Sequence, residues 1–178
     1  ELLAGHMIRH FAALTGDRHL CLAGGVAHNC SMNGMLVYSE LFDRVFVQPA
    51  SHDAGGALGA ALAVDLAERP EGVIAPLQHV YWGTDVPPND EVLRQLAEWE
   101  ALVSVEVLGE PCAVAANLLA QGQVIGWVQG RAEFGPRALG NRSILADPRP
   151  PEHKDIINRM VKKRESYRPF APSVLEER

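Results

Sequence analysis

The segment from Gly130 to Arg149 constrains this chain more than any other, because it follows a strand-like apolar run and mixes arginines with glycines and prolines. The apolar run covers residues 124–128, and the arginines are Arg131, Arg137, Arg142 and Arg149. Arginine presents a planar fork of donors that matches the oxygens of phosphates and carboxylates. Glycine lets the main chain approach an anion closely. A strand that ends in such a loop predicts an α/β fold with a site for an anionic substrate.

The charge distribution supports a focused anion site. Residues 131–168 hold ten Lys and Arg against five Asp and Glu, a local net charge of +5, whereas the rest of the chain carries −11. A nucleic-acid surface is usually broader and makes the whole domain basic. The pattern therefore favours a small anion over a nucleic acid.

The hydrophobic pattern predicts two α/β units. The first half predicts helices over 2–14, 29–41 and 54–67 with strands over 19–23 and 44–47. Four prolines between residues 69 and 89 indicate a linker, and residues 90–99 a connecting helix. The pattern then restarts, with strands over 102–107, 123–128 and 143–146 and helices over 111–121 and 151–160. We predict domains over 1–70 and 101–178, joined by a linker and helix over 71–100.

Several features of the first half allow both a functional and a structural interpretation. The turn Gly24-Gly25 would aim main-chain N–H groups at a nucleotide phosphate, although many turns use glycine in this way. Asp53 precedes a glycine-rich helix, as a ligand of a metal or Mg-nucleotide would, or as a helix N-cap would. His6 and His10 have metal-ligand spacing, but no third ligand is near in sequence, so two surface histidines are the simpler interpretation.

Cysteine usage and hydropathy predict the compartment. Cys21, Cys30 and Cys112 form no CxxC pair and indicate free thiols in a reducing, cytoplasmic environment, with Cys30 expected to be a small buried side chain. No apolar run reaches the roughly 18 residues of a membrane span, and no secretory leader opens the sequence. We therefore predict a cytoplasmic protein with no membrane association.

Four blocks, in order, resemble the O-carbamoyltransferases, the enzymes that tailor nodulation factors and antibiotics such as tobramycin and cephamycin. They are residues 23–30 (AGGVAHNC), 48–61 (QPASHDAGGALGAA), 129–149 (QGRAEFGPRALGNRSILADPR) and 164–174 (RESYRPFAPSV). The resemblance covers nearly the whole chain. Two departures are His28, where the family usually has an apolar residue, and Ala132, where methionine is common.

The resemblance implies the end of a domain with the actin-like ATPase fold followed by the start of a YrdC-like domain. In the family, the YrdC-like domain joins carbamoyl phosphate and ATP into carbamoyl adenylate and releases pyrophosphate. The actin-like domain binds an iron ion that polarises the carbamoyl group, and a hydroxyl of a small-molecule acceptor, a natural product or glycan, attacks it.

The resemblance also implies roles for individual residues. Arg137, Lys162 and Arg168 correspond to the catalytic clamp on carbamoyl phosphate, supported by Arg131, Arg142 and Ser143. Gly24, Gly25 and Asn29 correspond to part of the nucleotide site, with Mg²⁺ as a second candidate ion. Asp53 corresponds to one iron ligand. The family's other metal ligands, in an H-x-x-x-H motif, lie far upstream of the GGVA block, so we expect an incomplete portion that is inactive in isolation.

Two other functions remain open at this stage. An actin-like kinase or ATPase would use Gly24, Gly25 and Asp53, but it leaves the arginine block unexplained. A tRNA-binding or tRNA-modification module would use the basic segment over residues 131–168, but few aromatic residues accompany that segment for stacking on bases. The sequence leaves open the acceptor and the oligomeric state, with a homodimer as one alternative.

Overall fold

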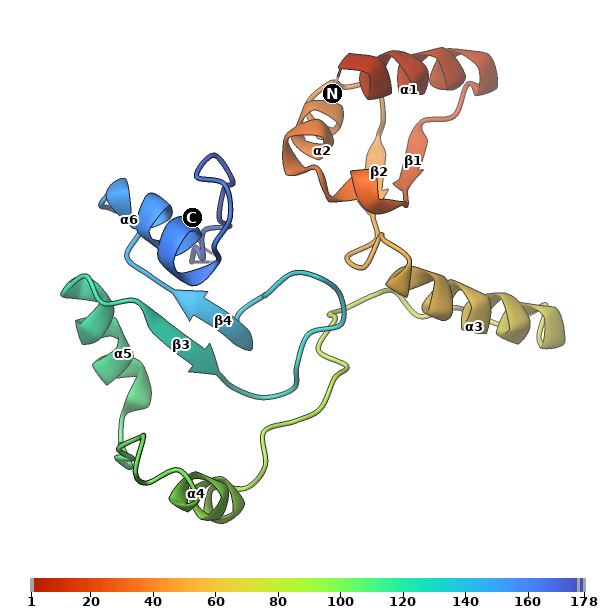
Figure 1. The fold of residues 1–178 in the computed structure, drawn as a ribbon. Helices are drawn as coiled ribbons and strands as arrows, with labels where there is room; N and C mark the ends of the chain where they lie inside the picture. The colour runs from red at the N-terminus through yellow and green to blue at the C-terminus, as the bar shows by residue number, and fades with distance from the viewer. Residues whose placement is uncertain (1, 176, 178) are drawn as a thin grey trace. The chain divides into compact units, whose positions relative to one another are not determined.

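The computed structural model describes residues 2–175 and 177 and divides the chain into two compact units (Figure 1). The first unit comprises the chain up to Gly83 together with Glu133–Arg137, and the second comprises Thr84–Ala132 and the chain from Ala138 onward. Helices accompany two small sheets of two strands each. The predicted mixture of α and β structure is confirmed.

The first unit is built around a βαβ element (Figure 1). Strands β1 (His19–Leu22) and β2 (Arg44–Val47) are parallel, and the crossover contains η1 (Gly25–His28) and α2 (Cys30–Val37). Helix α1 (Leu2–Thr15) packs against α2, and α3 (Ala54–Glu68) follows the turn after β2. Because parallel strands end at the same edge of a sheet, the segments after β1 and β2 are brought together. The buried apolar residues of this unit are Ala27, Met32, Leu36, Phe42, Ala50 and Val80.

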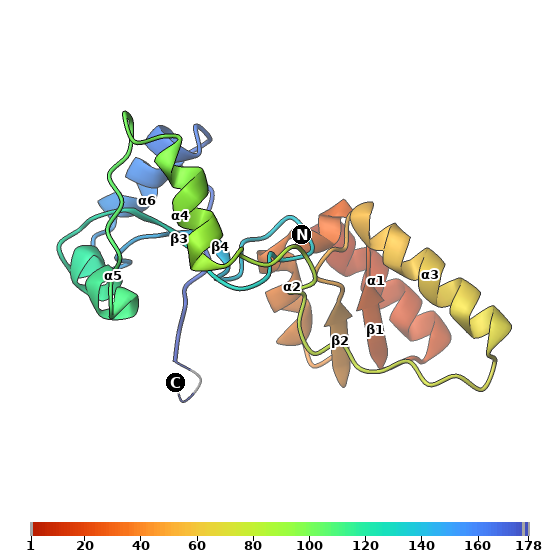
Figure 2. The same ribbon diagram turned by 90° about the horizontal axis from the view of Figure 1, so that it is seen from below.

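The second unit contains an antiparallel pair of strands with short helices around it. Strands β3 (Ile125–Val128) and β4 (Arg142–Leu145) pair with Trp127 opposite Ser143, and α5 (Pro111–Ala120) packs on β3 (Figure 2). Helix α4 (Asn89–Ala97) precedes α5. Helix α6 (Glu152–Ile156) continues directly into a π-helical turn, η2 (Ile157–Val161).

Most predicted elements are confirmed. The helix predicted over 151–160 is α-helical only over Glu152–Ile156 and continues as a π-helical turn, and two other elements differ for physical reasons. The helix predicted over 29–41 ends at Val37, because the Ser39 hydroxyl donates to the Leu36 carbonyl and Glu40 adopts a left-handed φ of 57°. The strand predicted over 102–107 is wrong: this segment is irregular, and Leu102 and Val107 are exposed. Its alternating valines match a strand pattern, but neither described sheet pairs with it, and a strand needs a partner for its backbone groups.

Two further expectations concern the cysteines and the presence of a membrane-spanning helix. Cys21, Cys30 and Cys112 are free, as predicted, and all three are exposed. The expected burial of Cys30 is wrong, because Cys30 opens α2 while Met32 and Leu36 form the buried face of that helix. Among the residues that the structure describes, no helix combines the length and the apolar character needed to cross a bilayer.

An ion pair fixes the turn after β4. Asp147 is nearly buried, and Arg149 donates to its carboxylate through Nε at 2.9 Å and Nη2 at 2.6 Å. The Arg149 main-chain N–H donates to the same carboxylate at 3.0 Å. These hydrogen bonds, side chain first, lower the pKa of Asp147 from 3.8 to about 2. His153 Nδ1 donates to the Asp147 carbonyl at 2.8 Å, which connects the turn to α6.

Replacing Asp147 with asparagine is expected to remove an acid-sensitive part of the stability. The charged carboxylate stabilises the folded state above the usual pKa of 3.8, and this contribution is lost as the pH falls through the folded pKa of about 2. The thermal midpoint of the parent chain should therefore exceed that of Asp147→Asn near neutral pH, with the gap closing between about pH 4 and pH 2. Thermal unfolding followed by circular dichroism at several pH values measures the gap, and a constant gap down to pH 2 would refute the assignment.

Candidate functional site

The carboxyl ends of β1 and β2 bring three polar side chains together. His28 closes η1 after β1, and Ser51 and His52 lie in the turn after β2. His28 Nε2 lies 3.3 Å from His52 Nδ1 and 3.3 Å from Ser51 Oγ. The Ser51 carbonyl also accepts a hydrogen bond from Gly24 N at 2.6 Å. The two post-strand segments are thus joined by both side-chain and main-chain contacts, at the edge where α/β sheets place their ligands.

Residues Glu133–Arg137 belong to the arginine-rich loop within residues 130–149, called the arginine loop, and they pack on this edge. Phe134 N donates to the Val80 carbonyl at 2.7 Å, and the Phe134 ring stacks on Trp82 with centroids 5.7 Å apart. Gly135 has a φ of +120° and lies so close to Ala50 that a Cβ would be 3.4 Å from the Ala50 Cβ. The positive φ and the close approach both favour glycine at this position.

Arg137 is held at this edge by its own contact with His28. Arg137 Nη2 donates to the His28 carbonyl at 3.1 Å, and the rest of the side chain is exposed. Burial, the positive charge of Arg137 and the neighbouring His52 lower the pKa of His28, in that order of importance. The lowered pKa favours the neutral imidazole of His28, so the positive charge at this edge comes from Arg137.

In the turn after β1, Gly24 and Asn29 have structural roles. Gly24 has a φ of +95°, and its carbonyl accepts from Ala27 N at 3.0 Å at the start of η1. Asn29 is the N-cap of α2, where its Oδ1 accepts from Met32 N at 3.0 Å. A Cβ on Gly25 would meet no atom within 4 Å. Gly25 therefore has open space beside it, and its role in nucleotide binding stays a prediction.

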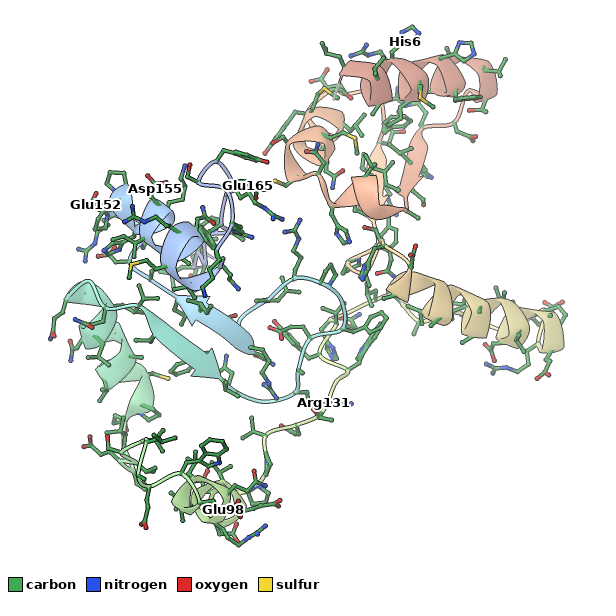
Figure 3. All side chains as sticks on the ribbon, viewed as in Figure 1. His6, Glu98, Arg131, Glu152, Asp155 and Glu165 are labelled. Carbon is green, nitrogen blue, oxygen red and sulfur yellow. The ribbon has the colours of Figure 1, made fainter. Side chains whose placement is uncertain are left out.

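Asp53 precedes α3 with an exposed side chain. It adopts helical dihedrals, φ −52° and ψ −30°, and makes no side-chain cap hydrogen bond. Asp53 therefore occupies the N-cap position of α3 without capping the helix through its side chain, which leaves the carboxylate oxygens for another partner. Within the described part of the chain, no group of three His, Cys, Asp or Glu side chains could hold a metal ion. His6 and His10 are exposed on α1, and Figure 3 shows His6 there, which fits the interpretation as surface residues.

The structure separates the cations of the second unit into two groups. Arg142 donates through Nη1 to the carbonyls of Gln129, Gly130 and Asn141 and through Nη2 to that of Thr84, at 2.8–3.1 Å. Arg149 is paired with Asp147. Arg142 and Arg149 therefore stabilise the loop itself. Ser143 has a similar role, because its hydroxyl accepts from Gly140 N at 2.9 Å.

Lys162 and Arg168 form the other group. Both are exposed; Arg168 makes one ion pair, with Glu165 at 3.7 Å, and the described residues offer no partner to the Lys162 amine. The main chain around them is held by Asn158, whose side chain is fully buried. Lys162 and Arg168 belong to the second unit and Arg137 to the first. Arg131 is exposed on the segment that leads into the loop (Figure 3), and its carbonyl accepts from Asn141 Nδ2 at 2.7 Å.

Sequence reasoning missed Ser51, His52 and Asn158. Ser51 and His52 immediately precede Asp53 at the end of a predicted strand, so their position at the ligand-binding edge was a signal that could have found them. Asn158 lies inside a predicted helix, where asparagine is unremarkable. Its importance comes from contacts with residues up to ten positions later, and no local pattern marks it.

Comparison with known proteins gives matches along most of the chain. The profile described as carbamoyltransferase N-terminus matches residues 6–62, and the profile described as carbamoyltransferase C-terminus matches residues 116–178. The chain is 56% identical over 177 residues to nodulation protein NolO of Bradyrhizobium diazoefficiens, covering 99% of the chain and 32% of that protein. It is also 56% identical to nodulation protein NolNO of Sinorhizobium fredii, with 99% and 26% covered.

A more distant relative shows the same pattern of coverage. Nodulation protein U of Rhizobium tropici is 40% identical over 178 residues, which is 96% of the chain and 27% of that protein. The chain thus spans about a third or less of the length of these relatives.

Proposed function

Because the chain belongs to the carbamoyltransferase family, we propose that it is part of an enzyme that activates carbamoyl phosphate with ATP and transfers the carbamoyl group to a hydroxyl of a small natural product or glycan. The nodulation proteins among its relatives support a glycan-like acceptor. Their greater length supports a longer enzyme to which this chain contributes the end of an actin-like domain and the start of a YrdC-like domain. Exposed apolar side chains such as Phe46 and Leu102 are consistent with further protein against these surfaces.

Exposure supports the assignment of the donor site to Arg137, Lys162 and Arg168, which are three of the exposed cations between residues 131 and 168. Within the described residues, Arg137 uses one of its five N–H donors on His28, and Lys162 and Arg168 are exposed. Arg142, Arg149 and Arg164 are instead engaged by carbonyls, a carboxylate and an amide. Three cations with donors available suit a dianionic acyl phosphate. We propose that they neutralise the phosphate and the negative charge that develops on the carbamoyl oxygen when water attacks.

The proposed activation balances only with water. Water attacks the carbamoyl carbon of carbamoyl phosphate, the bond to the bridging oxygen breaks, and inorganic phosphate leaves. The resulting carbamate oxygen attacks the α-phosphorus of ATP, which forms carbamoyl adenylate and releases pyrophosphate. The acceptor hydroxyl then attacks the carbamoyl carbon, AMP leaves, and the hydroxyl proton goes to solvent or to a base. Gly24, Gly25 and Asn29 would contact the nucleotide, with a Mg²⁺ ion as an option.

Asp53 fits a hard metal ion as one ligand, because its carboxylate is exposed and makes no cap hydrogen bond. We propose that it binds iron together with ligands that this chain does not contain. An iron ion there would act as a Lewis acid on the carbamoyl carbonyl. The turn from Ser51 to Asp53, held by His28 and Gly24, would fix the direction of the carboxylate.

Pyrophosphate release tests the proposal without knowledge of the acceptor. We expect the full-length protein to release pyrophosphate only when ATP and carbamoyl phosphate are both present, with carbamoyl adenylate, or AMP after its hydrolysis, and no ADP as the nucleotide product. A kinase or ATPase would produce ADP without carbamoyl phosphate. A folded protein that binds ATP and releases no pyrophosphate with carbamoyl phosphate would overturn the proposed activation step.

A further inference from the structure

The loop after α6 is organised by one buried polar side chain. Asn158 has an exposed fraction of 0%, and it is the second residue of the π-helical turn η2. A buried amide is costly unless its donors and acceptor are paired. The hydrogen-bond partners of this amide therefore indicate which parts of the loop it holds in place.

Asn158 bonds to the following loop at both ends of its amide. Its Nδ2 donates to the Arg168 carbonyl at 2.9 Å and to the Ser166 carbonyl at 3.3 Å, and its Oδ1 accepts from Arg164 Nε at 2.7 Å. The main-chain carbonyl of Asn158 also accepts from Arg164 N at 2.9 Å. Two carbonyls on one side and a guanidinium on the other fix the orientation of the amide, because only an NH₂ group can donate to carbonyls.

Arg164 extends this arrangement to the end of the loop. Its guanidinium carbon lies 4.8 Å from the centre of the Phe170 ring, a cation–π contact, and its Nη2 donates to the Pro169 carbonyl at 3.4 Å. Asn158 and Arg164 thus tie the start of the loop to its end. Glu165 lies in the same loop (Figure 3), where its carboxylate pairs with Arg168 at 3.7 Å.

Lys162 is placed by the same turn. Its N–H donates to the Ile157 carbonyl at 2.9 Å, which is the five-residue spacing of a π-helix, and the next residue, Lys163, has a left-handed φ of +48°. Such a dihedral is uncommon for a residue with a Cβ and costs energy that surrounding contacts must offset. π-Helical turns of this kind occur frequently at functional sites. The contacts of Asn158 with residues 164–168 close the loop directly after this strained residue.

We propose that Asn158 is a positioning residue that holds the main chain of Lys162 and Arg168 in place for carbamoyl phosphate. The inference rests on the proposed function of these two cations and goes beyond it, because it assigns a role to a residue that contacts neither substrate. An asparagine suits the position because it supplies two donors and one acceptor in a plane. Aspartate has the same shape but would turn both donor contacts into repulsion with carbonyl oxygens.

The test measures the dissociation constant of carbamoyl phosphate by calorimetry on the full-length protein and on Asn158→Asp, Arg168→Ala and the double variant. We expect Asn158→Asp to raise the dissociation constant about tenfold or more, as loss of supporting contacts around a site commonly does. In the Arg168→Ala background, the same change should have less than half of its effect on the logarithm of the constant. The affinity for ATP should change much less than that for carbamoyl phosphate.

Two further variants separate positioning from general damage. Arg164→Lys removes the donor to Asn158 Oδ1 while keeping the charge, and should raise the constant about threefold even if Asn158→Asp does not fold. Arg159→Ala, an exposed residue of the same turn, should leave the constant unchanged. Fully additive effects of Asn158→Asp and Arg168→Ala, or an unchanged constant in Arg164→Lys, would overturn the positioning role while the proposed function stands. No binding of carbamoyl phosphate to the parent protein would overturn both.

Discussion

Replacing Arg137 with alanine in the full-length protein is expected to lower kcat/KM for carbamoyl phosphate about 10²–10³-fold, the loss typical of removing a donor aimed at developing charge. Arg137 is exposed and uses one donor on the His28 carbonyl at 3.1 Å, so truncation leaves only that carbonyl without its partner. The thermal midpoint should therefore change little. Steady-state pyrophosphate release at varied carbamoyl phosphate measures the effect.

Two substitutions serve as controls for Arg137. Arg137→Lys keeps a positive charge but loses the planar fork, so its activity should lie between the parent protein and Arg137→Ala. Arg94→Ala removes an exposed arginine of α4 whose ion pair with Glu91 is 3.9 Å long, and it should leave kcat/KM unchanged. If Arg94→Ala and Arg137→Ala reduce activity equally, or neither does, Arg137 has no specific part in donor binding.

The predictable parts of the fold were those with a strong local signal. The helix over Ala54–Glu68 follows from its run of alanine and leucine, and β1 and β2 from short apolar runs bounded by turn residues. The strand predicted over 102–107 failed because alternation alone does not supply a neighbouring strand. The π-helical end of the last helix was also beyond local pattern, since it depends on contacts between Asn158 and residues further along the chain.

The chemistry of the candidate site was predictable from the sequence, but the different contacts of its arginines were not. Glycine and arginine spacing indicated an anion-binding loop, but the spacing alone did not distinguish its four arginines, and only the resemblance to a family separated Arg137 from the others. In the structure, Arg142 donates to four carbonyls, whereas Arg137 donates to one. The difference arises from where the chain turns after Phe134, and that turn depends on Val80, Trp82 and Ala50, which lie more than 50 residues earlier.

Asp53 illustrates how geometry changes a choice that sequence leaves open. A carboxylate before a helix usually caps it, and the sequence alone favoured that role. In the structure Asp53 has helical dihedrals, and its side chain accepts no hydrogen bond from the first N–H groups of α3. The missing cap hydrogen bond leaves the carboxylate without this partner, and the metal role, which comes from the resemblance to a family, stays a prediction.

Substitution of Gly55, near the start of α3, gives the largest stability effect that we expect. A Cβ on Gly55 would overlap the main-chain carbonyl of Ala50, an obstacle that has no rotamer to relieve it. Ala50 is fully buried, and Gly135 packs on it. Gly55→Ala should therefore displace the turn before Asp53 and lower the free energy of unfolding by about 3 kcal/mol, the upper range for overpacking. Urea denaturation followed by circular dichroism measures the change.

Gly56→Ala is the matched control, because it makes the same chemical change one residue later in the same helix. A Cβ there meets no atom within 4 Å, and alanine has a higher helix propensity than glycine. Gly56→Ala should therefore raise the free energy of unfolding by up to about 1 kcal/mol. Opposite signs for the two variants would show that close approach to Ala50, and not a general need for glycine, explains Gly55. Equal effects would contradict the close packing that holds Ala50, and with it the segment that carries Arg137, at this edge of the sheet.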